Sequence, residues 1–167
     1  MKTKLPLSEG LIHFPGYFDR AEQDVLVTAV RDVVAEAPLY VPVMPGTGKP
    51  MSVRMTNCGS LGWVTDKERG YRYQATHPVT GRPWLAIPQM LVDLWREVSD
   101  YDKDPEACLV NFYGDDAKMG LHQDRDETDF NAPVVSVSLG IDRIYPGTST
   151  LLKNGGRINL TLRRVNP

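Results

Sequence analysis

The sequence has few of the residues that build disulfide frameworks and zinc clusters. Its 167 residues include two cysteines, Cys58 and Cys108, and three histidines. Two isolated cysteines cannot form a disulfide scaffold or a four-cysteine zinc site, and a reducing compartment is then the default. No apolar run reaches the roughly 20 residues of a membrane helix, and the first residues show no signal peptide. We therefore expect a cytoplasmic monomer with no membrane partner.

A strong overall charge is also missing, since 19 basic and 21 acidic residues leave a net charge of −2. Any nucleic-acid partner must therefore bind a local patch. Residues 45–84 are the candidate, with six basic and two acidic side chains. Cations bind phosphates and rings stack on bases. The rings that alternate with these cations are Trp63, Tyr71, Tyr73 and Trp84. The composition also fits a solvated basic face whose rings turn into the core.

Two segments show helical periodicity. Residues 18–37 repeat apolar side chains at helical spacing, Asp19 and Glu22 match a capping box, and Pro38 ends the pattern. Residues 88–99 form the second segment, which begins at Pro88. Its expected buried stripe is Met90, Leu91, Leu94, Trp95 and Val98. We expect both helices to support a sheet.

Three strand-like runs follow the second helix, at residues 107–113, 132–139 and 156–165. No helical segment separates them, which disfavours a parallel βαβ arrangement. The sequence therefore predicts an α+β fold in one domain, with two helices packed on an antiparallel sandwich or barrel.

The segment His122-Gln123-Asp124 is a candidate metal site. Residues two apart in an extended segment point to the same side, so this imidazole and carboxylate can bind one metal ion. Two histidines and one carboxylate around iron leave positions open for a co-substrate and oxygen. The pair alone is a short motif that occurs often by chance, so its weight depends on its neighbours.

The last strand alternates two kinds of side chain. Ile158, Leu160 and Leu162 lie on one face, and the other face carries Arg157, Asn159, Thr161 and Arg163. Arginines that point into a sandwich are costly unless they meet an anion, and a small dicarboxylate suits the guanidinium fork. Asn111 and Tyr113 share one face of an earlier strand. The alternative is an edge strand whose arginines are merely solvated.

Several motifs occur together in a fixed order. They are Asn111-Phe-Tyr113, then Gly120-Leu-His122-Gln-Asp124-Arg-Asp126-Glu127, then residues 132–140, and finally Arg157-Ile-Asn159-Leu-Thr-Leu-Arg163. This order resembles the AlkB family of iron- and 2-oxoglutarate-dependent dioxygenases, which dealkylate nucleic-acid bases. Earlier motifs are similar to the family's nucleotide-recognition lid, namely Met51-Ser-Val-Arg-Met55, Leu61-Gly-Trp63 and Gly70-Tyr71-Arg-Tyr73.

The resemblance implies one domain over residues 1–167 with a double-stranded β-helix core, the jelly-roll or cupin-like fold. The core would occupy about residues 105–167, helices of the N-terminal half would buttress it, and about residues 45–84 would form the lid. The implied cofactors are Fe(II) and the co-substrate 2-oxoglutarate. The implied activity is oxidative dealkylation repair of bases of the 1-methyladenine or 3-methylcytosine type in single- or double-stranded DNA, or in RNA.

The resemblance assigns roles to the second half of the chain. His122 and Asp124 match two iron ligands. Asn111 and Tyr113 match side chains that hydrogen-bond 2-oxoglutarate. Its carboxylates would be bound by Arg157, Asn159 and Arg163. The last of these should form a bidentate salt bridge.

Nucleic-acid contacts are implied in the same way. Trp63 matches the ring that stacks on a flipped base, with His122 on the opposite face of that base. Further matched positions are Met51 and Met55 in the lid, Tyr71 and Lys118 at phosphates, and Asp126 and Glu127 near the base edge. The acidic pair favours a cationic alkylated base, since carboxylates stabilise positive charge nearby.

One expected residue is absent. The family's second iron-binding histidine should lie between Gly140 and Arg157, but the histidines of this chain are His13, His77 and His122. The similarity breaks at Gly140/Ile141, which predicts an internal deletion of on the order of 25–45 residues, or two to four strands with their loops. The β core would then be incomplete. His77 falls in a turn of the lid region and is a poor replacement ligand.

Two functional hypotheses remain open. The chain is an active dioxygenase of nucleic acid, or it is a catalytically dead remnant that binds nucleic acid or 2-oxoglutarate through the surviving lid and arginines. The missing histidine favours the second hypothesis. The sequence leaves open whether DNA or RNA, or even a protein, is the substrate.

Overall fold

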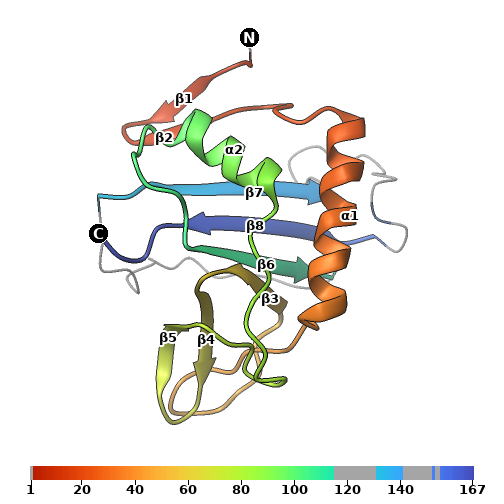
Figure 1. Cartoon of the computed structure of the whole chain (residues 1–167), viewed down its shortest axis with the longest axis vertical. Helices are drawn as coiled ribbons and strands as arrows, with labels where there is room; N and C mark the ends of the chain where they lie inside the picture. Colours follow the sequence, from red (N-terminus) through yellow and green to blue (C-terminus); the bar gives the residue numbers. More distant parts are fainter. Residues whose placement is uncertain (1, 115–130, 141–151, 153–154) are drawn as a thin grey trace.

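The computed structural model describes residues 2–114, 131–140, 152 and 155–167. Its elements are β1 (Leu5–Ser8), β2 (Leu11–His13), α1 (Arg20–Glu36), β3 (Arg54–Gly59), β4 (Gly62–Asp66), β5 (Gly70–Gln74), α2 (Gln89–Val98), β6 (Ala107–Tyr113), β7 (Val134–Gly140) and β8 (Arg157–Arg163). Both helices lie across the same face of one sheet (Figure 1). The predicted helices and strands are confirmed, each with its ends shifted by no more than two residues or unchanged.

Local sequence signals set the ends of α1. The Asp19 carboxylate accepts a hydrogen bond from the Glu22 N–H at 2.8 Å, and the Asp19 N–H donates to the Glu22 carboxylate at 2.8 Å. The predicted capping box is therefore formed. At the other end the Ala37 N–H donates to the Val33 carbonyl, and Pro38 follows. One stripe of the helix is buried, namely Leu26, Val27, Val30 and Val33.

The main sheet is antiparallel and has the strand order β3-β6-β8-β7. Strand β8 pairs with β6 on one side and with β7 on the other. The alternative in which the arginine-bearing strand lies at a sheet edge is therefore wrong. The order also explains how distant segments meet, because residues 54–59 and 157–163 both pair with β6.

The hydrophobic core lies between this sheet and the two helices. Cys108, Val110, Leu160 and Leu162 from the sheet pack with buried residues of α1 and α2. Trp95 of α2 has 0% exposure, and its indole N–H donates to the Lys103 carbonyl at 2.9 Å. The helix-facing side of β8 is thus apolar, as the alternation predicts, and its polar residues face away from the helices. No described helix has the length and apolarity needed to cross a membrane.

The predicted lid segment contains the antiparallel hairpin β4-β5, a two-stranded sheet of its own. Trp84 is buried beside it, and its indole N–H donates to the Gln74 carbonyl at 2.8 Å. Gly62 is required at this contact, since an added Cβ would lie 2.4 Å from a Trp84 ring carbon. Trp84 therefore turns into the core, whereas Tyr71 is 43% exposed. The alternative in which the rings turn into the core holds for Trp84, and the nucleic-acid role of the exposed Tyr71 stays a prediction.

Thr56 on β3 has a buried hydroxyl, with no hydrogen-bond partner among the described residues. A buried polar group without a partner costs roughly 1–3 kcal/mol. Thr56→Val keeps the branched shape and removes the hydroxyl, so we expect the free energy of unfolding to rise by about 1 kcal/mol. Urea denaturation measures this change. Thr28→Val, at an exposed position of α1, is the control and should bring no gain in stability. If Thr56→Val destabilises the protein, the Thr56 hydroxyl is hydrogen-bonded.

Glu106 ties the C-terminal segment to the start of β6. Its carboxylate accepts hydrogen bonds from the N–H groups of Val165 at 2.9 Å and Asn166 at 2.8 Å, and from the Asn166 side chain at 3.0 Å. Burial alone would raise the pKa of Glu106, but these bonds and the nearby Arg164 charge outweigh it and lower the pKa.

A lowered pKa in the folded state stabilises the fold above the unfolded value, about 4.3 for glutamate, and the stabilisation is lost as pH falls through the folded value. Glu106→Gln should therefore lower stability at pH 7 by about 1–2 kcal/mol and flatten the loss of stability below about pH 4.3. Melting temperatures across this range test the prediction. Glu9→Gln, on an exposed residue, serves as the control, and equal pH slopes in wild type and Glu106→Gln would contradict the assignment.

Candidate active site

The sheet face turned away from the helices carries the predicted co-substrate residues. Asn111 of β6 lies opposite Asn159 of β8, and Tyr113 lies opposite Arg157. Arg163 lies at the far end of β8, opposite Ala107. Directly paired residues of an antiparallel sheet project from the same face. The structure therefore brings all five predicted co-substrate residues onto one surface.

Neighbouring hydroxyls hold Asn159 in place. Its amide N–H donates to the Ser136 hydroxyl at 2.8 Å, and its carbonyl accepts from the Thr161 hydroxyl at 2.8 Å. These bonds orient the amide, with Nδ2 toward Ser136 and Oδ1 toward Thr161. Thr161, which the sequence placed on this face without a role, is thus a support for Asn159.

Tyr113 and Arg157 form a contact pair at one end of the face. The guanidinium carbon of Arg157 lies 4.7 Å from the centre of the Tyr113 ring. Tyr113 is only 4% exposed. Burial raises the pKa of its hydroxyl, and the positive charge of Arg157 offsets part of that rise. Tyr113 is therefore protonated at neutral pH and can donate a hydrogen bond to an anion.

Arg163 is a buried cation, with 5% exposure. A buried guanidinium is expected to meet an anion or other acceptors. Arg157 and Arg163 are six residues apart on one strand, about 20 Å between their Cα atoms. Their long side chains can therefore approach a short ligand with two anionic ends from opposite directions. Two guanidiniums, a phenol and two amides form a donor set that fits 2-oxoglutarate.

The predicted base-stacking ring lies beside this face. Trp63 packs against the buried cluster that contains Met55 and Leu109. Met55 pairs directly with Asn111, which pairs with Asn159, so the three form one row across the sheet. Met55 is 1% exposed, and its predicted role in the lid stays a prediction. Trp63 and the predicted co-substrate residues thus lie on the same side of the main sheet.

Tyr71 lies against Trp63 in the hairpin. Their ring centres are 5.4 Å apart and their planes are 23° from parallel. Tyr71 sits on β5 opposite Thr65, one step diagonal to Trp63, which pairs with Tyr73. One face of the indole is therefore covered by a second ring.

Local carboxylates hold three of the six basic residues in the lid segment. Arg72 lies 2.8 Å and Arg69 3.4 Å from the Asp66 carboxylate, and Arg82 lies 3.6 Å from Glu36. A hydrogen bond from the Arg69 N–H and the two guanidiniums lower the pKa of Asp66, against a smaller effect of burial. The six cations that the sequence grouped together are therefore not equally available to phosphates.

His77 has a structural role. It is 2% exposed, its Nε2 lies 2.8 Å from the Pro38 carbonyl, and its Nδ1 accepts from the N–H groups of Val79 and Thr80 at 3.1 and 3.2 Å. Both ring nitrogens are thus engaged by the backbone, and no lone pair is left for a metal. The prediction that His77 does not replace the missing ligand is supported by this geometry.

The predicted metal ligands lie in a part of the chain that the structure does not describe. This holds for His122 and Asp124 and for the predicted substrate residues Lys118, Asp126 and Glu127. It also holds for Ile141, at the predicted deletion. Met51 is described and half-buried. Within the described ranges no three His, Cys, Asp or Glu side chains group together in a way that could hold a metal ion.

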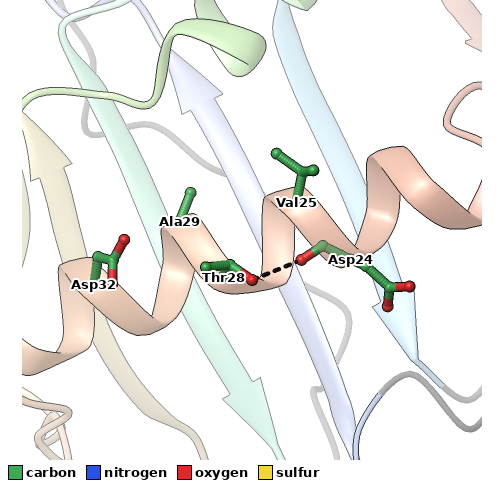
Figure 2. A pocket seen from close by; sticks show the side chains of 5 residues that line it. All are labelled: Asp24, Val25, Thr28, Ala29 and Asp32. Atoms are coloured by element: carbon green, nitrogen blue, oxygen red, sulfur yellow. Dashed lines mark hydrogen bonds between the residues drawn. The ribbon is translucent and has the colours of Figure 1, made fainter.

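A shallow depression on α1 is a poor candidate for the site. Figure 2 shows its lining, Asp24, Val25, Thr28, Ala29 and Asp32. Val25 is 58% exposed, so this is the solvent side of a helix whose other side packs on the sheet. Asp24 is already paired with Arg20 at 3.2 Å, and the depression offers no basic side chain of its own to bind 2-oxoglutarate or a nucleic-acid backbone.

The sequence reasoning gave no role to Tyr40 or Asn57, although the structure places both beside Trp63. The Tyr40 hydroxyl donates to the Trp63 carbonyl at 3.1 Å, and the Asn57 side chain bonds the Trp63 backbone. No strand was predicted around Asn57, so the sequence carried no signal that this amide would be buried and would need specific partners.

Known proteins resemble this chain over most of its length. The 2OG-Fe(II) oxygenase superfamily profile matches residues 10–145. An alpha-ketoglutarate-dependent dioxygenase AlkB homolog from Caulobacter vibrioides is 43% identical over 200 residues, covering 96% of this chain and 90% of the relative. The alpha-ketoglutarate-dependent dioxygenase AlkB of Escherichia coli is 43% identical over 145 residues, covering 84% of this chain and 65% of that protein.

A solved structure confirms the fold. The structure of OsALKBH1 superposes with a TM-score of 0.74 at 21% identity, covering 97% of this chain and 100% of that one. The antiparallel sheets and two helices agree with the jelly-roll fold of 2-oxoglutarate oxygenases, as predicted. The fold, the ordered motifs and the sequence matches agree, and the chain belongs to the AlkB family of Fe(II)- and 2-oxoglutarate-dependent dioxygenases.

Proposed function

We propose that this chain oxidatively dealkylates N-alkylated bases of the 1-methyladenine or 3-methylcytosine type in DNA, with RNA as the alternative polymer. The observation that carries the proposal is that Trp63 of the proposed lid and the proposed co-substrate residues lie on the same side of the main sheet. Trp63 packs against the buried cluster that contains Met55, and Met55 pairs with Asn111. A base stacked on that indole would lie next to the residues proposed to hold 2-oxoglutarate.

The proposed co-substrate residues offer different hydrogen-bond donors to a dicarboxylate. Tyr113 and Asn111 offer neutral hydrogen-bond donors, and Arg157 and Arg163 offer guanidiniums at the two ends of β8. Charge-assisted bonds from guanidinium to carboxylate are short and directional, so they set the position of the ligand. His122 and Asp124 are the proposed ligands of Fe(II), which would supply oxidation of the N-alkyl carbon by O2. One oxygen atom would enter the alkyl group, which leaves as an aldehyde, and the other would enter succinate as 2-oxoglutarate loses CO2.

The lid selects the substrate base. A base inside a duplex is inaccessible, so it must leave the stack to reach the site. The Trp63 ring offers an aromatic surface for it, and an aromatic face also attracts the positive charge of a methylated base. Asp126 and Glu127 are proposed to add negative charge near the base edge. Tyr71 and Lys118 are proposed phosphate contacts, and Met51 and Met55 proposed apolar supports of the lid.

Formaldehyde release tests the proposal. Single-stranded DNA and RNA of one sequence, each with one 1-methyladenine, would be incubated with the protein, Fe(II), 2-oxoglutarate and oxygen. We expect release that depends on every component, and the faster polymer is the preferred substrate. The same oligonucleotides with unmodified adenine serve as controls. Protein that is folded by circular dichroism but gives no turnover would rule out the activity of this chain.

A second function is favoured by a specific observation. The chain has three histidines, His77 is engaged by the backbone, and the expected second iron-binding histidine is not in the sequence. The match to the Caulobacter relative spans 200 residues, more than the 167 of this chain, which supports the proposed internal deletion. The alternative is a catalytically inactive protein that binds nucleic acid or 2-oxoglutarate.

Iron affinity distinguishes the two functions. A catalyst should bind Fe(II) stoichiometrically under anaerobic conditions when 2-oxoglutarate is present, whereas an inactive binding protein need not. Sequencing of the coding region across Gly140/Ile141 would show whether a segment that contains a histidine belongs there.

A further inference from the structure

Asn57 is a buried amide in the middle of β3. Its exposure is 0%, and it pairs with Leu109 on β6. A buried amide is costly unless it is hydrogen-bonded. The partners of Asn57 therefore indicate why a polar residue occupies this strand.

Both ends of the Asn57 amide bond to one residue, Trp63. The Asn57 Nδ2 donates to the Trp63 carbonyl at 2.9 Å, and the Trp63 N–H donates to the Asn57 Oδ1 at 2.9 Å. The Tyr40 hydroxyl donates to the same carbonyl at 3.1 Å and lies 3.4 Å from the Asn57 Nδ2. The Asn57 side chain thus offers the donor and the acceptor that a neighbouring strand would offer.

The geometry of the hairpin explains why Trp63 needs such a partner. In an antiparallel ladder the N–H and C=O of one residue point to the same side of the strand. Those of Trp63 point to Asn57, and so they point away from β5, with which β4 pairs. Asn57 and Tyr40 occupy the side where a third strand would lie, and they satisfy backbone groups that are costly to leave unbonded.

We propose that Asn57, assisted by Tyr40, is a positioning residue that fixes the Trp63 backbone and thereby the plane in which its ring meets a flipped base. The proposal rests on the stacking role of Trp63 in the proposed function. Asn57 acts through Trp63, because its amide bonds the Trp63 backbone, so its effect on the base is indirect.

The hydrogen bonds from Asn57 and Tyr40 to the Trp63 backbone are called the clamp below, and the Trp63 ring makes separate contacts. The ring stacks on Tyr71 at 5.4 Å and packs against the Met55 cluster. Side chains occupy discrete rotamers, so a shift of the Trp63 peptide moves the ring as a unit. Loss of the clamp should therefore tilt or loosen the stacking surface while the main sheet stays intact.

The clamp itself is tested by amide hydrogen exchange followed by NMR. In Asn57→Ala the Trp63 N–H loses its acceptor, and we expect its exchange to become about tenfold faster, the equivalent of one net hydrogen bond. Cys58→Ala is the matched control, because Cys58 is the next residue on β3, is also buried, and packs in the core on the helix side. Exchange at Trp63 should be unchanged in that control.

The effect on recognition is tested by binding. Fluorescence anisotropy gives the affinity for a single-stranded DNA with one 1-methyladenine and for the same DNA with adenine, and their ratio is the discrimination. We expect Trp63→Ala to lower discrimination about tenfold, the equivalent of one base–aromatic stack. Asn57→Ala should lower it by a similar factor, and Cys58→Ala should leave it unchanged at a comparable melting temperature.

A double-mutant cycle separates positioning from general destabilisation. If Asn57 acts through Trp63, the Asn57→Ala change should have little further effect in the Trp63→Ala background. Additive losses would overturn the inference, as would full discrimination in Asn57→Ala or unchanged exchange at Trp63. Full discrimination in Trp63→Ala would instead contradict the proposed function itself. If Asn57→Ala does not fold, Tyr40→Phe replaces it, with an expected loss of about threefold from one weaker hydrogen bond.

Discussion

Arg163→Leu is expected to weaken 2-oxoglutarate binding by at least about 100-fold. Arg163 is 5% exposed on the face that also carries Asn111 and Asn159. Loss of one partner from a buried charge pair costs about 3–5 kcal/mol, which corresponds to that factor or more. Titration calorimetry of 2-oxoglutarate into protein loaded with Mn(II), a redox-inert substitute for Fe(II), measures the change.

Arg96→Leu is the control, because Arg96 pairs with Asp104 on the surface away from this face. Equal 2-oxoglutarate affinity in Arg163→Leu and wild type would refute the proposed carboxylate site.

Asp124→Ala is expected to lower Fe(II) affinity by more than about 100-fold. His122 and Asp124 are the proposed protein ligands, so this change removes one of two. Loss of a residue that merely orients a ligand already costs about 10–100-fold in metal affinity, and loss of the ligand itself should cost more. Anaerobic equilibrium dialysis with 2-oxoglutarate gives the affinity.

Asp126→Ala is the matched control for the iron site, since it removes a carboxylate two residues further along. It is proposed to lie near the base edge, so it should keep Fe(II) affinity and lose discrimination for the methylated base. If Asp124→Ala binds Fe(II) as wild type does, the metal assignment is wrong. If wild type itself binds no Fe(II), the inactive binding protein is the correct function.

Interactions within a few residues were readable from the sequence. The Asp19–Glu22 capping box is local and is confirmed. The helical periodicity of α1 is also confirmed, although Val25 is exposed and Val27 is buried in its place. The two-residue alternation of β8 correctly separated its leucines from its arginines, because strand geometry imposes that period on every strand. The motifs also led to the family, which the comparisons show.

The sequence did not predict which strands pair when they are far apart along the chain. Cys58 and Cys108 are 50 residues apart and read as isolated, yet they are paired on β3 and β6 as two free, buried thiols. Contact with Cys58 and burial raise the pKa of the Cys108 thiol. Nothing local in either segment indicates this pairing, since it follows from which strands become neighbours in the sheet.

The sequence by itself determined the two helices, the three strands β6, β7 and β8, the face of β8 that carries its arginines, and the family. Each of these depends on local periodicity or on motifs in order along the chain. The tertiary structure alone decided that β8 lies inside the sheet, that His77 is engaged by the backbone, and that Asn57 holds Trp63. These three depend on partners that are distant in sequence, and such partners meet only when the strands and the hairpin pack together.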